Sequence, residues 1–331
     1  MAESRRLEGV IDLPREILVA SEALGQSVQG HTGLDAFTLF LPSLADPFAG
    51  NWMYLNPPYF DDHEVLGLLG QRTWGRPSSP ERMMVLGPSW VHSVVVRIDA
   101  EPLGRQSDGL AAEAAGTADA FGQRFAVWYG RFAAWLEIWT PQRLMSNPSG
   151  EPKLRGRVFF RIDENVQLTG WGEAFGPVEL YHARDAVTLK VLRAAAAKAS
   201  LGASPPLEWQ LLIRALRYDD DRRQSVIDAA SAAEVAMAQA ARAKLGSVPD
   251  KAIEAIIQSA NGVAGMVELL EAIDEATGKS WRSRVAARLA GPRNDAAHRG
   301  LTPSHETTTE AIAQAIDLVN KYSPRPNPDD T

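Results

Sequence analysis

The sequence predicts an α+β protein, in which a mixed antiparallel-sheet domain is followed by an all-α helical bundle. β-Branched, partly alternating segments such as Val91–Ile98 occur in the first two thirds of the chain and indicate strands. After two adjacent prolines, Pro205 and Pro206, apolar residues recur every three or four positions, as they do along one face of a helix. Strands followed by a run of helices are typical of an α+β chain.

The composition indicates a soluble, globular protein. The 331 residues suffice for two domains, with 45% hydrophobic and 23% charged residues. No apolar run reaches the roughly 18 residues of a membrane span, and no secretory signal is evident, so we expect a cytoplasmic protein that does not contact a membrane. The absence of cysteine excludes disulfides and thiolate metal sites. The net charge of −7 gives no general attraction to nucleic acid, so binding of RNA requires a local basic patch.

The first domain is predicted to span residues 1–203 and to sense or bind a ligand that the sequence does not identify. A short helix is expected near Glu16–Leu24 and a longer one over Asp185–Ser200. A lone histidine within a strand, His92, is more typical of a structural residue than of a ligand. The expected strands are Phe37–Leu41, Met84–Leu86, Val91–Ile98, Arg157–Ile162 and Val166–Trp171, with the last two joined as a hairpin.

A row of aromatic residues marks a further helix of this domain, which Pro141 ends. Nucleic-acid bases stack on such rows. A stripe this regular is far more typical of a helix face in the hydrophobic core. The residues are Phe121, Phe125, Trp128, Phe132, Trp135 and Trp139.

Two short motifs resemble those of amino-methyltransferases. Asp46–Gly50 is similar to their cofactor loop, and Asn56–Tyr59 is similar to their catalytic motif. Only five residues separate the two here, which is too few for a βαβ crossover between them. We therefore interpret this segment as a turn-rich loop on the domain surface.

The second domain is predicted to span residues 204–322 and to be helical. Its alanine-rich composition favours close helix packing. The Pro- and Asp-rich residues 323–331 are predicted to be disordered. The expected helices are Leu207–Tyr218, Arg222–Leu245, a third from Pro249 to Ile273 with a break near Gly262, Trp281–Leu289, and Glu306–Tyr322.

Arg293, Asn294 and His298 form a motif between the last two predicted helices. Arg-x4-His with an Asn directly after the Arg resembles the signature of the HEPN superfamily, whose best-known members are metal-independent endoribonucleases. The run Tyr218–Arg223, leading to Ala232–Glu234, also resembles the second-helix pattern of large HEPN proteins. The resemblance covers roughly the last third of the chain and implies a helical bundle that acts on RNA without a cofactor or metal.

The residue types of this motif suit RNA cleavage, because RNA carries its own nucleophile, the 2′-hydroxyl group. The reaction needs a base, a cation beside the phosphate and an acid for the leaving oxygen. Histidine suits proton transfer near neutral pH, and arginine offers a fixed fork of donors to phosphate. Asn294 can orient either partner. On a helix His298 lies about 140° round from Arg293, so one chain is expected to present a loose pair. The resemblance implies that two protomers pool their pairs in one cleft of a homodimer.

A basic segment leads into the motif and is expected to bind RNA through Arg282, Arg284, Arg288 and Arg299. The alternative is a solvated helix face whose cations pair with acids of neighbouring helices. Asp295 is expected to weaken RNA binding, because it places an acid beside the motif. Pro292 is expected to interrupt the helical hydrogen bonds there.

The resemblance implies an endoribonuclease of the kind found among toxins and antiviral-defence effectors, which the first domain or a partner protein restrains or directs. The alternative is a non-catalytic HEPN module that dimerises or binds nucleotide or RNA, with a ligand-binding first domain. In that case Arg293 and Asn294 brace the bundle, and His298 makes a buried hydrogen bond.

Overall fold

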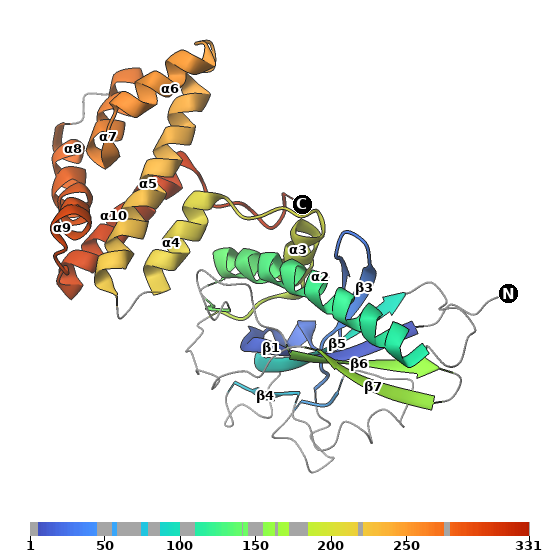
Figure 1. Cartoon of the computed structure of the whole chain (residues 1–331). Coiled ribbons are helices and arrows are strands. Elements are labelled where there is room, and N and C mark those ends of the chain that lie inside the picture. The colour runs from blue at the N-terminus through green and yellow to red at the C-terminus, as the bar shows by residue number, and fades with distance from the viewer. Residues whose placement is uncertain are drawn as a thin grey trace. The chain divides into compact units, whose positions relative to one another are not determined.

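The computed structural model describes residues 6–44, 55–57, 74–78, 87–99, 110–140, 142–144, 155–162, 165–171, 185–217, 221–274 and 279–330. The chain divides into two compact units, Met1–Ser204 with Asn327–Thr331 and Pro205–Pro326. This division lies one residue from the predicted border between residues 203 and 204. The first unit contains an antiparallel sheet and the second is helical, so the predicted α+β class is confirmed (Figure 1).

The described residues of the first unit form a seven-stranded sheet with the order β2-β3-β5-β1-β6-β7, and β4 pairs with β5. The strands are β1 (Arg6–Val19), β2 (Ser27–His31), β3 (Ala36–Phe40), β4 (Gly75–Pro77), β5 (Ser89–Asp99), β6 (Arg155–Ile162) and β7 (Asn165–Trp171). Every pairing between these strands is antiparallel, and the predicted hairpin of β6 and β7 is present. The predicted strand Met84–Leu86 lies outside the described residues.

The prediction of a short helix near Glu16–Leu24 is wrong. Strand β1 continues to Val19, and only Ser21–Ala23 forms a single 3₁₀ turn. After an irregularity between Asp12 and Ile17, the strand resumes its pairing with β5. Pairing with a distant strand therefore overrides the local preference of this segment.

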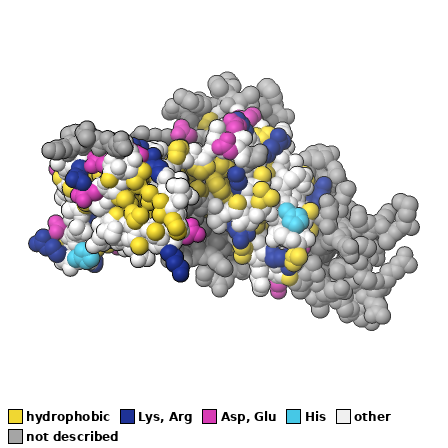
Figure 2. Space-filling view, turned by 90° about the horizontal axis from the view of Figure 1, so that it is seen from above, with side chains coloured by type: hydrophobic (Ala, Val, Ile, Leu, Met, Phe, Trp, Pro, Cys, Tyr) yellow, Lys and Arg dark blue, Asp and Glu magenta, His cyan; other side chains and the backbone are white. Residues whose placement is uncertain are grey.

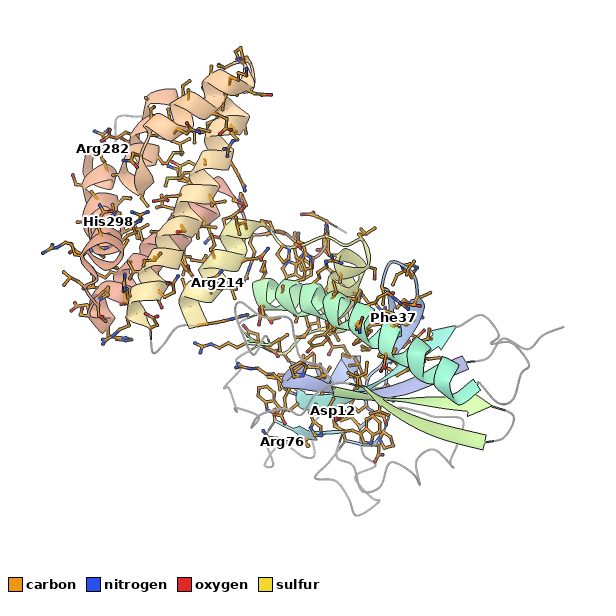
Figure 3. All side chains as sticks on the ribbon, in the orientation of Figure 1. Asp12, Phe37, Arg76, Arg214, Arg282 and His298 are labelled. Carbon is orange, nitrogen blue, oxygen red and sulfur yellow. The ribbon has the colours of Figure 1, made fainter. Side chains whose placement is uncertain are left out.

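Helix α2 (Leu110–Trp139) crosses one face of the sheet (Figure 1). Phe37 of β3 points toward this helix (Figure 3). Its ring meets those of Phe121, Phe125 and Trp128 edge to face, with centroid distances of 6.0, 5.2 and 4.8 Å. These side chains are buried, so the interpretation of the aromatic row as core is confirmed.

Helix α3 (Leu189–Ser200) confirms the predicted helix and packs against α2. It begins at Thr188, whose hydroxyl accepts a hydrogen bond from the backbone N–H of Val191. Two indoles of α2 donate to this region, Trp128 to the Ser200 hydroxyl at 3.2 Å and Trp135 to the Ala203 carbonyl at 2.9 Å. The buried indole N–H groups are thereby satisfied.

Asn56 of the second methyltransferase-like motif and the lone histidine His92 both have structural partners. The backbone of Asn56 pairs with that of Ser43 through hydrogen bonds of 3.1 and 2.9 Å. His92 Nδ1 lies 3.8 Å from Glu16 Oε1, which favours a structural role for this histidine. Asp46–Gly50 lies outside the described residues.

The second unit consists of α4 (Leu207–Arg217), α5 (Arg222–Lys244), α6 (Asp250–Ser259), α7 (Gly262–Ile273), α8 (Lys279–Val285), a π-helical turn (Ala286–Ala290), α9 (Gly291–Arg299) and α10 (His305–Tyr322). The break near Gly262 separates α6 from α7 as predicted. Helix α5 contacts α4, α7, α9 and α10, and its buried alanines allow these helices to approach closely. No helix in the described part of the chain is long and apolar enough to cross a membrane.

The segment after α10 differs from the predicted disorder. Ser323 donates from its hydroxyl to the buried Glu208 carboxylate at 2.5 Å, and its carbonyl accepts from the Trp209 indole at 3.1 Å. The Arg325 guanidinium lies over the Trp209 ring. Proline- and aspartate-rich composition thus does not prevent order here, because buried side chains of α4 supply hydrogen-bond partners.

Candidate active site

Helix α9 carries the Arg-x4-His motif, and its position is fixed at both ends. The π-helical turn before it continues the helical backbone to Pro292, which lies in the first turn of α9. The interruption of helical hydrogen bonds expected at Pro292 therefore does not end the helix. Gly300 ends α9 with a left-handed φ of 66°, which favours glycine. Arg223 of α5 donates from Nε to the Ala296 carbonyl at 2.8 Å and holds α9 against the bundle.

The side chains of Arg293 and His298 meet within one chain. Arg293 Nη1 lies 3.2 Å from His298 Nε2. Because a guanidinium only donates, Nε2 is the acceptor of this contact in the tautomer that carries its proton on Nδ1. Arg293 Nη1 also lies 3.3 Å from the Asn294 side-chain oxygen and donates to it. The long arginine side chain therefore closes the angular gap that predicted only a loose pair.

These residues open into a cavity of about 370 Å³. Helix α9 contributes Arg293, Asn294, His298 and Arg299, and the first turn of α7 forms another part of the wall. Glu234 projects from α5 into the same space. The structure thus brings all three predicted catalytic residues, and one of the four predicted RNA-binding residues, to a single cavity.

Glu234 is the cavity residue that the sequence did not identify as functional. Its Oε1 lies 4.0 Å from Arg293 Nε, and the backbone N–H of Val263 donates to the carboxylate. Burial raises the pKa of Glu234, and the Arg293 charge and the Val263 N–H partly offset that effect. The only sequence signal was the run Ala232–Glu234, which resembles the second-helix pattern of the family but does not itself indicate a site.

Arg282, Arg284 and Arg288 do not line the cavity. Arg282 pairs with Glu268 at 3.2 Å, and Arg288 Nη2 lies 4.0 Å from Glu310. Figure 3 shows Arg282 on α8 at a separate place from His298, and the π-helical turn separates α8 from α9 along the chain. On the described part of the face shown in Figure 2, Lys and Arg side chains are interspersed with acidic and hydrophobic ones. The pairing of Arg282 and Arg288 with acids matches the alternative of a solvated, ion-paired face.

Arg299 differs from these three because it lies at the cavity. It donates from Nη1 to Asp295 at 2.8 Å, four positions earlier on the same helix. Both side chains are largely exposed, so the pair is weak and Arg299 remains available to an anion. Asp295, which was expected to weaken RNA binding, therefore forms its ion pair with Arg299.

The cavity combines features that suit a phosphate group. Two guanidinium groups and an imidazole line it, and the N-terminal end of α7, the positive end of the helix dipole, forms part of its wall. Among the residues that the structure describes, no group of three or more histidine and carboxylate side chains could hold a metal ion. No family model matches the chain, and neither a curated protein nor a solved structure does.

Proposed function

We propose that this protein is a HEPN-type, metal-independent endoribonuclease. The observation that carries the proposal is the 3.2 Å contact between Arg293 and His298 at a cavity large enough for a nucleotide phosphate and its sugar. An arginine and a histidine in contact supply the fixed positive charge and the proton-transfer group that phosphodiester cleavage needs.

Each motif residue has a separate role in this proposal. Arg293 binds the scissile phosphate and stabilises the charge that develops on its oxygens. His298 takes part in proton transfer, and Asn294 holds the guanidinium through the 3.3 Å hydrogen bond. Arg299 contacts a neighbouring phosphate of the RNA chain.

The proposal includes a homodimer, as the family resemblance implies, which places two such cavities near one RNA molecule. It also includes a role as a toxin or antiviral-defence effector, whose sheet unit or a partner protein directs the nuclease. These parts rest on resemblance to multidomain HEPN proteins.

The test is cleavage of an end-labelled single-stranded RNA by the full chain in the presence of EDTA. We expect wild type to cut, and Arg293→Ala and His298→Ala to lose roughly 10²–10⁴-fold in rate while keeping the wild-type circular dichroism spectrum. Arg282→Ala and His305→Ala are matched controls, since neither residue lines the cavity. Equal rates in wild type and the two motif variants exclude the proposed site.

A non-catalytic HEPN module is the second candidate, and one observation favours it. Arg282 and Arg288 lie beside acids, which leaves less positive charge for RNA than the sequence implied. In that case RNA or nucleotide binds without cleavage, and Arg293→Ala reduces binding alone. A filter-binding measurement beside the cleavage assay separates the two candidates.

A further inference from the structure

Glu234 and Arg293 face each other in the cavity as a loose ion pair that lacks a hydrogen bond. Oε1 of Glu234 and Nε of Arg293 are 4.0 Å apart, beyond hydrogen-bond distance. Both atoms are buried, and neither has a hydrogen-bond partner among the described residues. Buried polar atoms without partners are uncommon and costly, so such a pair at a cavity indicates a place for ligand atoms.

The order of these two groups matches a feature of RNA. Oε1 of Glu234, an acceptor without a hydrogen bond, lies beside Nε of Arg293, a donor without one. In RNA the 2′-hydroxyl, a donor, lies beside the 3′-phosphate, an anionic acceptor. A ribonucleotide placed in the cavity beside both residues offers a partner to each of these two atoms, whereas a deoxyribonucleotide offers no donor to Glu234 Oε1.

We propose that Glu234 is the general base of the reaction and takes the proton of the 2′-hydroxyl. This inference rests on the ribonuclease function proposed above. It assigns a base from α5 and an acid from α9 to the same chain, so the proton transfers do not require the second subunit.

The 2′-hydroxyl proton moves to Glu234 Oε1 while the 2′-oxygen forms a bond to phosphorus. The bond between phosphorus and the 5′-oxygen breaks, and protonated His298 gives its proton to that leaving oxygen. When the substrate binds, Arg293 exchanges its hydrogen bond to His298 Nε2 for hydrogen bonds to the phosphate oxygens. The products are a 2′,3′-cyclic phosphate and a 5′-hydroxyl end, and no other reactant is consumed.

The surroundings of Glu234 suit a base. The titratable or charged groups that line the cavity with it are Arg293, His298 and Arg299, all on α9, while α7 contributes the Val263 N–H. Burial raises the pKa of the Glu234 carboxyl, which makes its ionised form a stronger base than an exposed glutamate. The rate should therefore fall on the acid side as this carboxylate becomes protonated.

Glu234→Gln is the decisive variant, because glutamine keeps an oxygen that can accept from the Val263 N–H but cannot take up a proton. We expect roughly 10²-fold or greater loss of kcat, and no acid limb in the pH–rate profile from the Glu234 carboxylate. Glu234→Asp should recover part of the rate and show an acid limb again. Glu254→Gln is the control, since it removes one negative charge of the same bundle from an exposed pair with Arg242.

A second readout uses binding alone. The Kd is measured for oligonucleotides that carry either a 2′-hydroxyl or a 2′-hydrogen at the scissile position. Two proteins are used, the inactive His298→Ala variant and the double variant that also carries Glu234→Ala. We expect the protein that retains Glu234 to bind the 2′-hydroxyl oligonucleotide several-fold more tightly than the 2′-hydrogen one. This preference should disappear in the double variant that also carries Glu234→Ala.

The outcomes separate the two proposals. If Arg293→Ala and His298→Ala lose activity while Glu234→Gln keeps the wild-type rate and pH profile, Glu234 is not the base and the ribonuclease proposal stands. If wild type cuts no RNA, or the Arg293 and His298 variants cut normally, both proposals are overturned.

Discussion

Arg293 Nη1 lies 3.2 Å from His298 Nε2, although five positions separate the residues on α9. A helix sets side chains with this spacing about 140° apart, so the contact depends on the length of the arginine side chain. A shorter or differently shaped cation cannot reach the imidazole and also face Glu234. The contact between Arg293 and His298 is therefore made within one chain.

Mixing the Arg293→Ala and His298→Ala proteins should not restore activity. Each chain then lacks one member of its own pair, and the contact shows no need for a member from the other chain. The measurement is RNA cleavage after the two variants are unfolded together and refolded to exchange subunits. A site shared between subunits would instead recover about a quarter of wild-type activity, because half of the dimers would be mixed with one intact site each.

Arg293→Lys should separate charge from geometry. Lysine keeps the positive charge but lacks the planar fork that places Nη1 against His298 while Nε faces Glu234. We expect kcat to fall about 10²-fold while the Kd for RNA changes by less than about threefold.

Arg282→Lys controls for the same substitution at an ion-paired arginine of α8. A nearly unchanged kcat in Arg293→Lys would show that a point charge suffices, and it would remove the role assigned to the guanidinium fork.

The helices of the second unit and the aromatic face of α2 could be predicted from the sequence, because apolar spacing reports the buried face of a helix directly. The extent of β1 could not, since residues after Asp12 form a strand only through their pairing with Val91 and its neighbours. Local pattern is a weaker guide when the stabilising partner is distant in the chain.

In the candidate site, too, some residues could be predicted from the sequence and others could not. Arg293, Asn294 and His298 are close in sequence, so their spacing could be recognised. Glu234 reaches them only because α5 packs against α7 and α9, and its unpaired oxygen is a property of that packing. The ion pairs of Arg282 likewise depend on where α7 places Glu268.

Arg299→Ala should weaken RNA binding in a salt-dependent way. Arg299 is exposed at the cavity, and its pair with Asp295 is too exposed to hold it from phosphate. We expect the slope of log Kd against log salt concentration for single-stranded RNA to decrease by about 0.7, the change for one lost phosphate contact.

The matched change Arg282→Ala should leave that slope unaltered, since Arg282 is held by Glu268 and Glu271 away from the cavity. Equal slopes for the two variants would assign phosphate binding to some other surface.

Glu234→Gln should raise the melting temperature at neutral pH. The pKa of Glu234 is raised in the folded state, chiefly by burial, so folding favours the protonated carboxyl. That contribution to stability is fully present below the ordinary glutamate pKa and is lost as the pH rises through the raised one. Glutamine stays neutral throughout and loses nothing over this range. The difference in melting temperature between variant and wild type should therefore be small near pH 4 and grow toward pH 8, whereas Glu254→Gln should show no such growth. A variant that melts below wild type at pH 8 would mean that the carboxylate stabilises the bundle through Arg293, and that its burial does not carry the cost expected of a functional group.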